Sequence, residues 1–319
     1  MAEKGRIDTH THLFPPRYIA ERAEGIANGA PGYPAEVMLG WTPEKSLAAM
    51  AKYDIAAMIV SVSPPGVWSG DRAASRALSR ACNEYGAELI ARHRDRFGMF
   101  ATLPLPDVEA SLAEISYAFD TLKLDGVGLL TSYDNKWPGD PAFARVFDEL
   151  NRRKAVVYFH PTASERCEGL IPGIPEPILE YVFDTTRAIV SLLYSGTLSR
   201  CADIRFIFSH GGGTLPYLAD RIASLARRPW EGKLRELVPK GVEYELKKLY
   251  YDAVSIVGNP PGFAAFQSYV PHSQILFGTD FPYLDPSRTV EPLARIDLPA
   301  AERAAIDRGN ALKLFPRFA

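Results

Sequence analysis

Residues 7–12, Ile7-Asp8-Thr9-His10-Thr11-His12, place two histidines two positions apart at the end of an apolar segment, just before Pro15-Pro16 interrupts the chain. Side chains two residues apart on a β-strand point to the same face, so His10 and His12 share a face and Asp8 lies one step below them. Two neighbouring imidazoles at a strand end can supply half of a metal site, or can form a hydrogen-bonded pair. The positions of the other histidines and aspartates along the chain decide between these interpretations.

Short apolar segments recur along the chain, and most of them precede a helical pattern. After the first segment, the predicted strands are 55–62, 97–103, 125–130, 155–160, 204–210, 249–254 and 274–280. Helices are expected from Pro43, over 71–93, 107–122, 141–153 and 176–199, after the glycines at 211–213, and over 288–315. Thr42 and Asp107 are the predicted N-caps of two of them.

Eight apolar strands alternating with helices predict a (β/α)8 TIM barrel, because near-continuous apolar runs are typical of parallel strands that are buried on both faces. The 319 residues are expected to form a single domain with inserted segments at about 13–42 and 226–247. A doubly wound parallel sheet is the alternative fold. It is expected to carry a glycine fingerprint after an early strand, which this chain lacks.

The composition is that of an ordinary globular protein, and the net charge of −2 at pH 7 gives no electrostatic basis for binding nucleic acid or an anionic membrane. No apolar run reaches the roughly 18 residues of a membrane-spanning helix, and the first residues lack the apolar core of a signal peptide. The three cysteines, Cys82, Cys167 and Cys201, match no CxxC spacing. We therefore expect a cytoplasmic protein whose partner is a small molecule.

Three further metal-competent side chains end predicted strands. His160 ends the fifth strand, His210 the sixth and Asp280 the eighth. The carboxyl ends of barrel strands converge on one mouth, where barrel enzymes carry out their chemistry. Taken singly, each residue could be a satisfied core residue or a helix cap, but together they predict a metal site with His10 and His12. The other two histidines, His93 and His272, fall in a helix and a loop and are expected at the surface.

One metal ion is expected rather than two. The fourth strand ends Gly128-Leu129-Leu130-Thr131, without a lysine that could be carbamylated to bridge two ions. We therefore predict a single divalent ion bound by His10, His12, His160 and Asp280. Mixed nitrogen and oxygen ligands favour zinc, with manganese as the alternative. His210 is then available for proton transfer, because its ordinary pKa is near neutrality, or it is a fifth ligand.

The chain resembles the amidohydrolase superfamily, at the branch called amidohydrolase 2. The resemblance rests on IDTHTHLFPP, YFHPT, FDTTRAIVSLLYSGTL, FSHGGGTLPYLADRI, YYDAV, ILFGTDFPY and GNALKLF, which together span nearly the whole chain. Within the branch it is similar to metal-dependent, non-oxidative decarboxylases, those of 6-methylsalicylate above all and also those of aminocarboxymuconate semialdehyde. This resemblance implies a TIM barrel, the same four metal ligands, His210 as acid/base and a homodimer. It also implies an aromatic, hydroxybenzoate-type carboxylic acid as substrate.

Candidate substrate contacts come from the arginines and the aromatic residues near the strand ends. The semialdehyde decarboxylases carry an arginine near the position of Ser46, and this departure counts against the semialdehyde as substrate. Arg221 and Arg228, which follow the glycines, are candidates for contacting a carboxylate or for surface salt bridges. The aromatic residues of the strand-end loops are candidates for lining the pocket or for ordinary packing: Phe14, Trp68, Trp137, Phe281 and Tyr283.

The predicted reaction is loss of CO2 from a hydroxybenzoate. A metal ion can chelate the carboxylate and an ortho oxygen, and Asp280 could protonate the ring carbon so that the departing electron pair restores aromaticity. His210 could polarise the substrate or activate a metal-bound water. The same site could instead hydrolyse a lactone or an amide. A serine esterase would need the G-x-S-x-G motif that this chain lacks, and a binding module would not need a free histidine beside the ligands.

Overall fold

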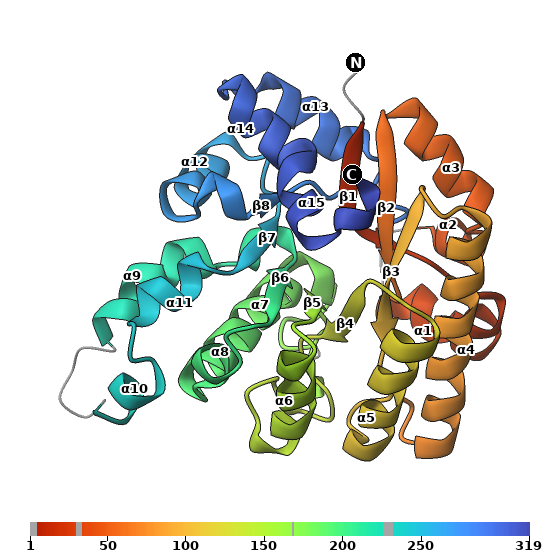
Figure 1. Ribbon diagram of the computed structural model, residues 1–319, viewed down its shortest axis with the longest axis horizontal. Helices are drawn as coiled ribbons and strands as arrows, with labels where there is room; N and C mark the ends of the chain where they lie inside the picture. The colour runs from red at the N-terminus through yellow and green to blue at the C-terminus, as the bar shows by residue number, and fades with distance from the viewer. Residues whose placement is uncertain (1–4, 30–33, 168, 226–231) are drawn as a thin grey trace.

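The computed structural model describes residues 5–29, 34–167, 169–225 and 232–319. Eight parallel strands follow one another around a nearly closed barrel, in the order in which they occur along the chain (Figure 1). The strands are β1 Arg6–His12, β2 Ile55–Ser61, β3 Phe97–Thr102, β4 Gly126–Leu130, β5 Val156–His160, β6 Arg205–Phe208, β7 Tyr250–Asp252 and β8 Ile275–Leu276. This arrangement confirms the predicted (β/α)8 barrel.

The barrel closes where the segment after β8 runs beside β1. The Thr9 N–H donates to the carbonyl of Phe277 at 3.0 Å, and the Asp280 N–H donates to the carbonyl of His10 at 2.8 Å. On its other side β1 pairs with β2, and the register shifts between Asp8 and Thr11, which is the irregularity of a β-bulge. The predicted strand 274–280 is therefore regular only over its first part, because the rest turns toward the histidines of β1.

Helices surround the barrel on the outside (Figure 1). They are α1 Pro16–Gly29, α2 Ala35–Leu39, α3 Pro43–Lys52, α4 Arg72–Arg92, α5 Val108–Ser116, α6 Ala144–Arg152, α7 Glu176–Tyr194, α8 Thr197–Arg200, α9 Leu215–Leu225, α10 Gly232–Leu237, α11 Val242–Lys247, α12 Pro260–Tyr269, α13 Ser287–Arg295, α14 Ala300–Ala304 and α15 Asn310–Leu314. The predicted caps are confirmed, since the Thr42 side chain accepts from Lys45 N–H and the Asp107 side chain from Ala110 N–H. No helix within the described ranges is both long and apolar enough to cross a membrane.

The predicted insertions contain helices that the sequence pattern did not indicate. The first holds α1 and α2, and α1 buries Tyr18, whose hydroxyl donates to the carbonyl of Ser63 at 2.8 Å. The second holds α10 and α11, and its residues 226–231 lie outside the described part of the chain. The helix predicted over 176–199 ends at Tyr194, because Gly196 adopts a left-handed conformation with φ of 73°.

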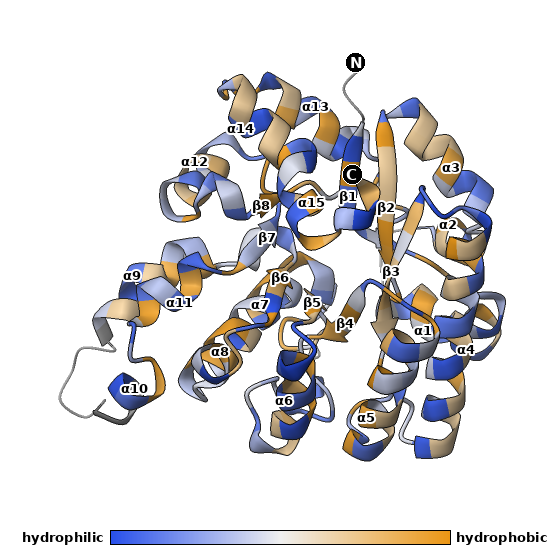
Figure 2. Ribbon diagram, viewed as in Figure 1, coloured by the Kyte–Doolittle hydropathy of each residue, from blue (hydrophilic) through white to orange (hydrophobic). Residues whose placement is uncertain are grey.

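The core consists of the barrel interior and the layer between strands and helices. Figure 2 shows the apolar colour along β2 and β4 and as stripes on the surrounding helices. Inside the barrel, Phe100 stacks on Tyr158 with ring centroids 5.0 Å apart. On the outer side of the sheet, Phe159 stacks on Phe208, also at 5.0 Å. These fully buried contacts hold the carboxyl ends of β5 and β6 in fixed positions beneath the histidines.

Candidate metal centre and adjoining cavity

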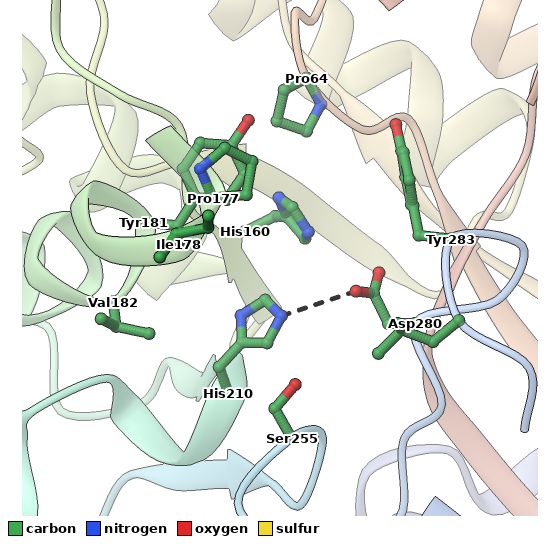
Figure 3. Close-up of a pocket in the computed structure, with 11 residues that line it drawn as sticks. Pro64, His160, Pro177, Ile178, Tyr181, Val182, His210, Ser255, Asp280 and Tyr283 are labelled. Carbon is green, nitrogen blue, oxygen red and sulfur yellow. Dashed lines mark ion pairs between the residues drawn. The ribbon is translucent and has the colours of Figure 1, made fainter. Parts of the chain in front are cut away.

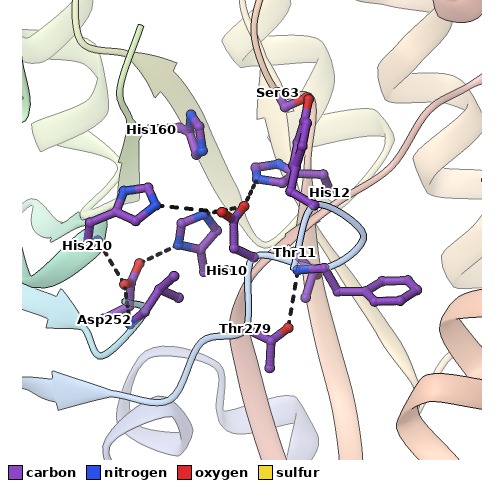
Figure 4. A network of polar contacts seen from close by, with 12 residues as sticks. His10, Thr11, His12, Ser63, His160, His210, Asp252 and Thr279 are labelled. Atoms are coloured by element: carbon purple, nitrogen blue, oxygen red, sulfur yellow. Dashed lines mark hydrogen bonds and ion pairs between the residues drawn. The ribbon is translucent and has the colours of Figure 1, made fainter. Parts of the chain in front are cut away.

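Three histidines and one aspartate meet at the carboxyl end of the barrel (Figure 4). One ligand atom each from His10, His12, His160 and Asp280 lies within 4.8 Å of the other three. Asp280 Oδ1 is 3.2 Å from His10 Nε2 and 3.0 Å from His12 Nε2. The structure therefore brings together the four residues that the sequence predicted as metal ligands, from β1, from β5 and from the segment after β8.

The donor atoms of this cluster fit a divalent cation. His10 Nε2 is shielded from solvent, and its one described polar neighbour, Asp280 Oδ1 at 3.2 Å, does not form a well-directed hydrogen bond with it. Burial lowers the pKa of His12 and holds that of His160 well below its ordinary value, so both imidazoles are neutral and can donate a lone pair. Three imidazole nitrogens and one carboxylate oxygen around a common point are a typical donor set for zinc or a related metal.

Without a cation, the charges within the cluster balance each other. Burial opposes protonation of His10, but the carboxylates of Asp252 and Asp280 outweigh it and raise the pKa of His10 to about 10. Burial also opposes the charge of Asp280, yet the histidines around it hold the pKa of its carboxyl well below the usual range. A cation held by these residues would take the place of the His10 proton as the positive partner of the two carboxylates.

The second ring nitrogen of each ligand histidine is held by a different group. His10 Nδ1 is 2.8 Å from Asp252 Oδ2, and both side chains are fully buried. His12 Nδ1 faces the hydroxyl of Ser61 at 3.2 Å, and His160 Nδ1 faces the carbonyl of Pro161 at 2.9 Å. Asp252 ends β7 in the stretch YYDAV, and sequence reasoning did not assign it a role. The strand-end rule that identified the other residues would have found it.

His210 lies beside the cluster but apart from its four ligand atoms. Its Nε2 is 3.7 Å from Asp280 Oδ2, the oxygen that does not face His10 and His12 (Figure 3). His210 has a left-handed backbone with φ of 52°, and Gly211, Gly212 and Gly213 also have positive φ. A side chain at Gly213 would put its Cβ 2.1 Å from the carbonyl oxygen of Val182. These glycines therefore let the chain turn tightly from β6 to α9 and aim His210 at Asp280.

Asp280 is fixed by a second buried carboxylate. Asp8 Oδ1 accepts the backbone N–H groups of His10 and Thr279, each at 3.1 Å, and Asp8 Oδ2 accepts the Thr279 hydroxyl at 2.6 Å. Burial raises the pKa of Asp8 to about 7. Asp280 itself has a positive φ of 63°, which few non-glycine residues adopt. Asp8 thus links β1 to the segment that carries Asp280. It lies one step below His10 and His12 on β1, as the alternation of side chains along a strand predicted.

A cavity of about 260 Å3 opens from the cluster to the surface (Figure 3). His160, His210 and Asp280 form its floor, and Tyr181, Ser255 and Tyr283 supply hydroxyl groups. Its apolar wall consists of Pro64, Pro177, Ile178, Val182 and Leu284. Within the described part of the chain, no lysine or arginine lines this cavity. A bound metal ion would therefore be the positive partner for an anionic ligand.

Comparison with known proteins places the chain in a family. The model of the amidohydrolase family, Amidohydro_2, matches residues 7–317. This chain belongs to that family. The decarboxylase macB of Penicillium terrestre is 37% identical to it over 98% of this chain and 95% of the relative. The 6-methylsalicylic acid decarboxylase of Penicillium expansum is 35% identical over 98% and 96%.

A solved structure shares the fold of this amidohydrolase-family protein. A dihydroxybenzoic acid decarboxylase from Polaromonas, with bound manganese and the inhibitor 2-nitroresorcinol, superposes with a TM-score of 0.84. The two chains are 20% identical, and the match covers 98% of this chain and 97% of that one. The predicted resemblance to the amidohydrolase 2 branch and the predicted barrel are both confirmed.

Among the predicted substrate contacts, the structure places Tyr283 on the cavity wall. Phe14 is buried against Tyr283, with ring centroids 6.0 Å apart, and neither Phe14 nor Trp68 is among the lining residues. Phe281 is partly buried and packs against the hydrophobic core. Trp137 donates its indole N–H to Asp184 Oδ1 at 2.7 Å and so has a structural partner away from the cavity.

No arginine is among the described residues that line the cavity. Arg221 is exposed on α9 and is not among the lining residues, and Arg228 lies outside the described residues. Ser46 is buried and accepts the indole N–H of Trp41 at 3.0 Å. His272 Nδ1 lies 2.8 Å from a carboxylate oxygen of Glu302, away from the metal cluster.

Residues of α7 form much of the cavity wall, and sequence reasoning did not predict them. Pro177, Ile178, Tyr181 and Val182 lie on the first two turns of this helix. Their positions along the helix, one turn apart, would have indicated a common face. The pattern does not say whether that face meets the core or the substrate, so only the folded arrangement identifies it as a wall of the site.

Proposed function

We propose that this protein is a metal-dependent, non-oxidative decarboxylase of a hydroxybenzoate-type carboxylic acid similar to 6-methylsalicylate. The observation that carries the proposal is the pairing of Asp280 Oδ2 with His210 Nε2 at the floor of a mostly apolar cavity, 3.7 Å apart. Relatives 33–37% identical to this chain are decarboxylases, among them two 6-methylsalicylic acid decarboxylases. Their names agree with the activity predicted from the sequence.

His10, His12, His160 and Asp280 would hold one divalent ion. Zinc is the proposed ion because it favours a four-coordinate set of nitrogen and oxygen ligands, and manganese is the alternative. Manganese is bound in the dihydroxybenzoic acid decarboxylase that shares the fold. When bound, the ion supplies a Lewis acid and a fixed positive charge that orients a carboxylate and an ortho oxygen.

The two oxygens of Asp280 have different surroundings. Oδ1 faces the ring nitrogens of His10 and His12, whereas Oδ2 faces His210. The 3.7 Å between Asp280 Oδ2 and His210 Nε2 is too long for a hydrogen bond, but it places His210 beside the carboxylate that would carry a proton to the substrate. Protonation of the ring carbon that bears the carboxylate forms a C–H bond, and cleavage of the bond to the carboxylate returns its electron pair to the ring. One proton is consumed for each CO2 released.

The cavity lining favours an aromatic substrate with a single carboxylate. Burial raises the pKa values of Tyr181 and Tyr283 above that of an ordinary phenol, so both hydroxyls stay protonated, and that of Tyr283 also bonds the Ser63 hydroxyl at 2.8 Å. Ile178, Val182 and Leu284 offer an apolar surface to a ring or a methyl group. A second carboxylate would find no lysine or arginine among the described lining residues, so its burial would be costly.

A panel of hydroxylated and methylated benzoates tests this proposal. The purified protein, supplied with zinc or manganese, is expected to release CO2 from a methylated hydroxybenzoate and to leave benzene dicarboxylates unchanged. Acid or amine release from lactones and amides without CO2 evolution would support the hydrolase instead and overturn the proposal.

His210→Asn is the matched variant for that assay. The amide keeps a polar group of similar reach but cannot exchange a proton near neutral pH, so kcat is expected to fall by about 10²–10⁴-fold. His210 is not one of the four ligand residues, so metal content by elemental analysis should stay within about twofold of the wild type. Full turnover in this variant would remove His210 from the mechanism, and metal loss would indicate that it is a fifth ligand.

We also propose that the protein is a homodimer in the cytoplasm. Four exposed apolar residues lie beside the mouth of the cavity: Leu170, Ile171 and Ile174 between β5 and α7, and Ile178 on the first turn of α7. A second copy covering this face would remove apolar surface from water. Light scattering should give about twice the chain mass, and Ile174→Lys with Ile178→Lys should reduce it to the monomer value. A monomeric wild-type protein would contradict the proposed dimer.

A further inference from the structure

Asp252 links two parts of the candidate active site through its two oxygens. Oδ2 lies 2.8 Å from His10 Nδ1, and Oδ1 accepts the backbone N–H groups of His210 at 2.9 Å and Val254 at 3.1 Å (Figure 4). The side chains of Asp252 and His10 are both completely buried. Gly278 packs so closely against them that a Cβ there would lie 2.9 Å from His10 Cβ and 3.2 Å from Asp252 Cβ. The carboxylate therefore has one defined position.

We propose that Asp252 is a positioning residue of the metal centre, and that it holds His10 in the one tautomer that can bind metal. The carboxylate accepts the proton on Nδ1, which leaves the lone pair of Nε2 pointing at the other ligand atoms. A carboxylate behind a ligand histidine also raises the basicity of the imidazole, and loss of such a group typically costs metal affinity. The inference rests on the proposed metal site and not on the identity of the substrate.

The other two ligand histidines have weaker partners. His12 Nδ1 faces the hydroxyl of Ser61 at 3.2 Å and its carbonyl at 3.4 Å, and His160 Nδ1 faces a backbone carbonyl at 2.9 Å. Only His10, among the three ligand histidines, meets an acidic side chain at its Nδ1. Asp252 Oδ1 also accepts the backbone N–H of His210. A change at Asp252 should therefore affect the site more than a change at Ser61.

Asp252→Asn replaces the carboxylate with an amide of nearly the same shape. The asparagine oxygen must take the place of Oδ1 to keep the two backbone N–H bonds, and this turns its amide N–H2 toward His10 Nδ1. The N–H2 group donates only, so Nδ1 must become an acceptor and the ring proton must move to Nε2, the atom that faces the other ligand atoms. The opposite amide orientation would keep the tautomer but would set N–H2 against the N–H groups of His210 and Val254.

Manganese binding measures the first consequence. Free Mn2+ in a titration of the metal-free protein is read from its electron paramagnetic resonance signal, without any substrate. We expect Asp252→Asn to weaken Mn2+ binding by about 10- to 100-fold, and Ser61→Ala, the matched control behind His12, by less than about threefold. Equal affinities of Asp252→Asn and wild type would overturn the proposal, as would an equal loss in the two variants. Both outcomes are independent of which reaction the protein catalyses.

The wild-type protein provides a measurement that does not depend on the variant folding. In the zinc-loaded protein, nitrogen-15 spectra of the histidine rings should show His10 with a proton on Nδ1, shifted downfield and protected from exchange by the buried carboxylate. This signal should persist in Ser61→Ala and be lost or shifted in Asp252→Asn. A wild-type His10 that carried its proton on Nε2, or that had a freely exchanging Nδ1 proton, would refute the positioning role.

Discussion

The sequence offered Trp137 as a candidate for lining the substrate cavity, whereas the structure places its side chain away from the cavity. A variant of Trp137 can therefore distinguish a structural role from a substrate contact. Its indole N–H donates to Asp184 Oδ1 at 2.7 Å, and the Thr131 hydroxyl donates to Asp184 Oδ2 at 2.5 Å. Asp184 is fully buried, and Arg187 is 3.7 Å from it. Trp137→Phe would remove one hydrogen bond to a buried charged group and keep an aromatic ring in place.

The expected loss of stability follows from that hydrogen bond. A hydrogen bond to a charged group contributes about 1.5–3 kcal/mol. With an unfolding entropy of about 2.1 cal/mol/K for each residue, a chain of this length should lose roughly 2–4 °C in Tm. Turnover in the metal-loaded protein should stay within about twofold of the wild type, because Trp137 does not line the cavity.

The effect of Trp137→Phe should depend on pH. Burial raises the pKa of Asp184, whereas the hydrogen bonds from Thr131 and Trp137 lower it. Loss of the indole N–H therefore raises the pKa of the folded state further above the unfolded value. A carboxyl group whose pKa is higher in the folded than in the unfolded state destabilises the fold progressively as pH rises from the unfolded-state pKa through the folded-state pKa. The stability difference between variant and wild type should thus be larger at pH 8 than at pH 5.

Differential scanning calorimetry of the metal-free proteins at both pH values tests this reasoning. Trp68→Phe is the matched control, since no hydrogen bond of the Trp68 indole is found within the described residues, and its Tm should fall by less. The reasoning is refuted if Trp137→Phe keeps the wild-type Tm, or if it loses turnover at full stability. Loss of turnover at full stability would indicate that Trp137 contacts the substrate.

Two further predictions concern the residues that build the metal centre. His160→Ala should lower bound metal by at least about tenfold at equal total metal, measured by elemental analysis after dialysis, and full metal content would contradict its role as ligand. Thr279→Val removes the hydroxyl that donates to Asp8 at 2.6 Å. It should cost about 1.5–3 kcal/mol in denaturant unfolding at pH 8.5, where Asp8 is ionised, against about 0.5–1.5 kcal/mol for Thr9→Val, whose hydroxyl donates to a neutral carbonyl. Equal losses in the two valine variants would mean that the charge of Asp8 is not involved.

The sequence alone determined the barrel and the residues that face one another at its mouth. Apolar runs and the turns after them are local signals, and the ends of parallel strands in a barrel always meet on one side. His10, His12, His160 and Asp280 could therefore be grouped before any coordinates were known, although they are spread over 271 residues of the chain. The resemblance of the same stretches to a known family predicted the decarboxylase activity.

Only the tertiary structure decided what each side chain contacts. Asp252 meets His10 across 242 positions of the chain, and Trp137 meets Asp184 across 47. The cavity wall comes from the first turns of α7, whose apolar face could equally have packed into the core. Periodicity tells which face of an element a residue occupies, but its partner depends on how distant elements pack when the barrel closes. That information lies in long-range contacts and not in any local segment of the chain.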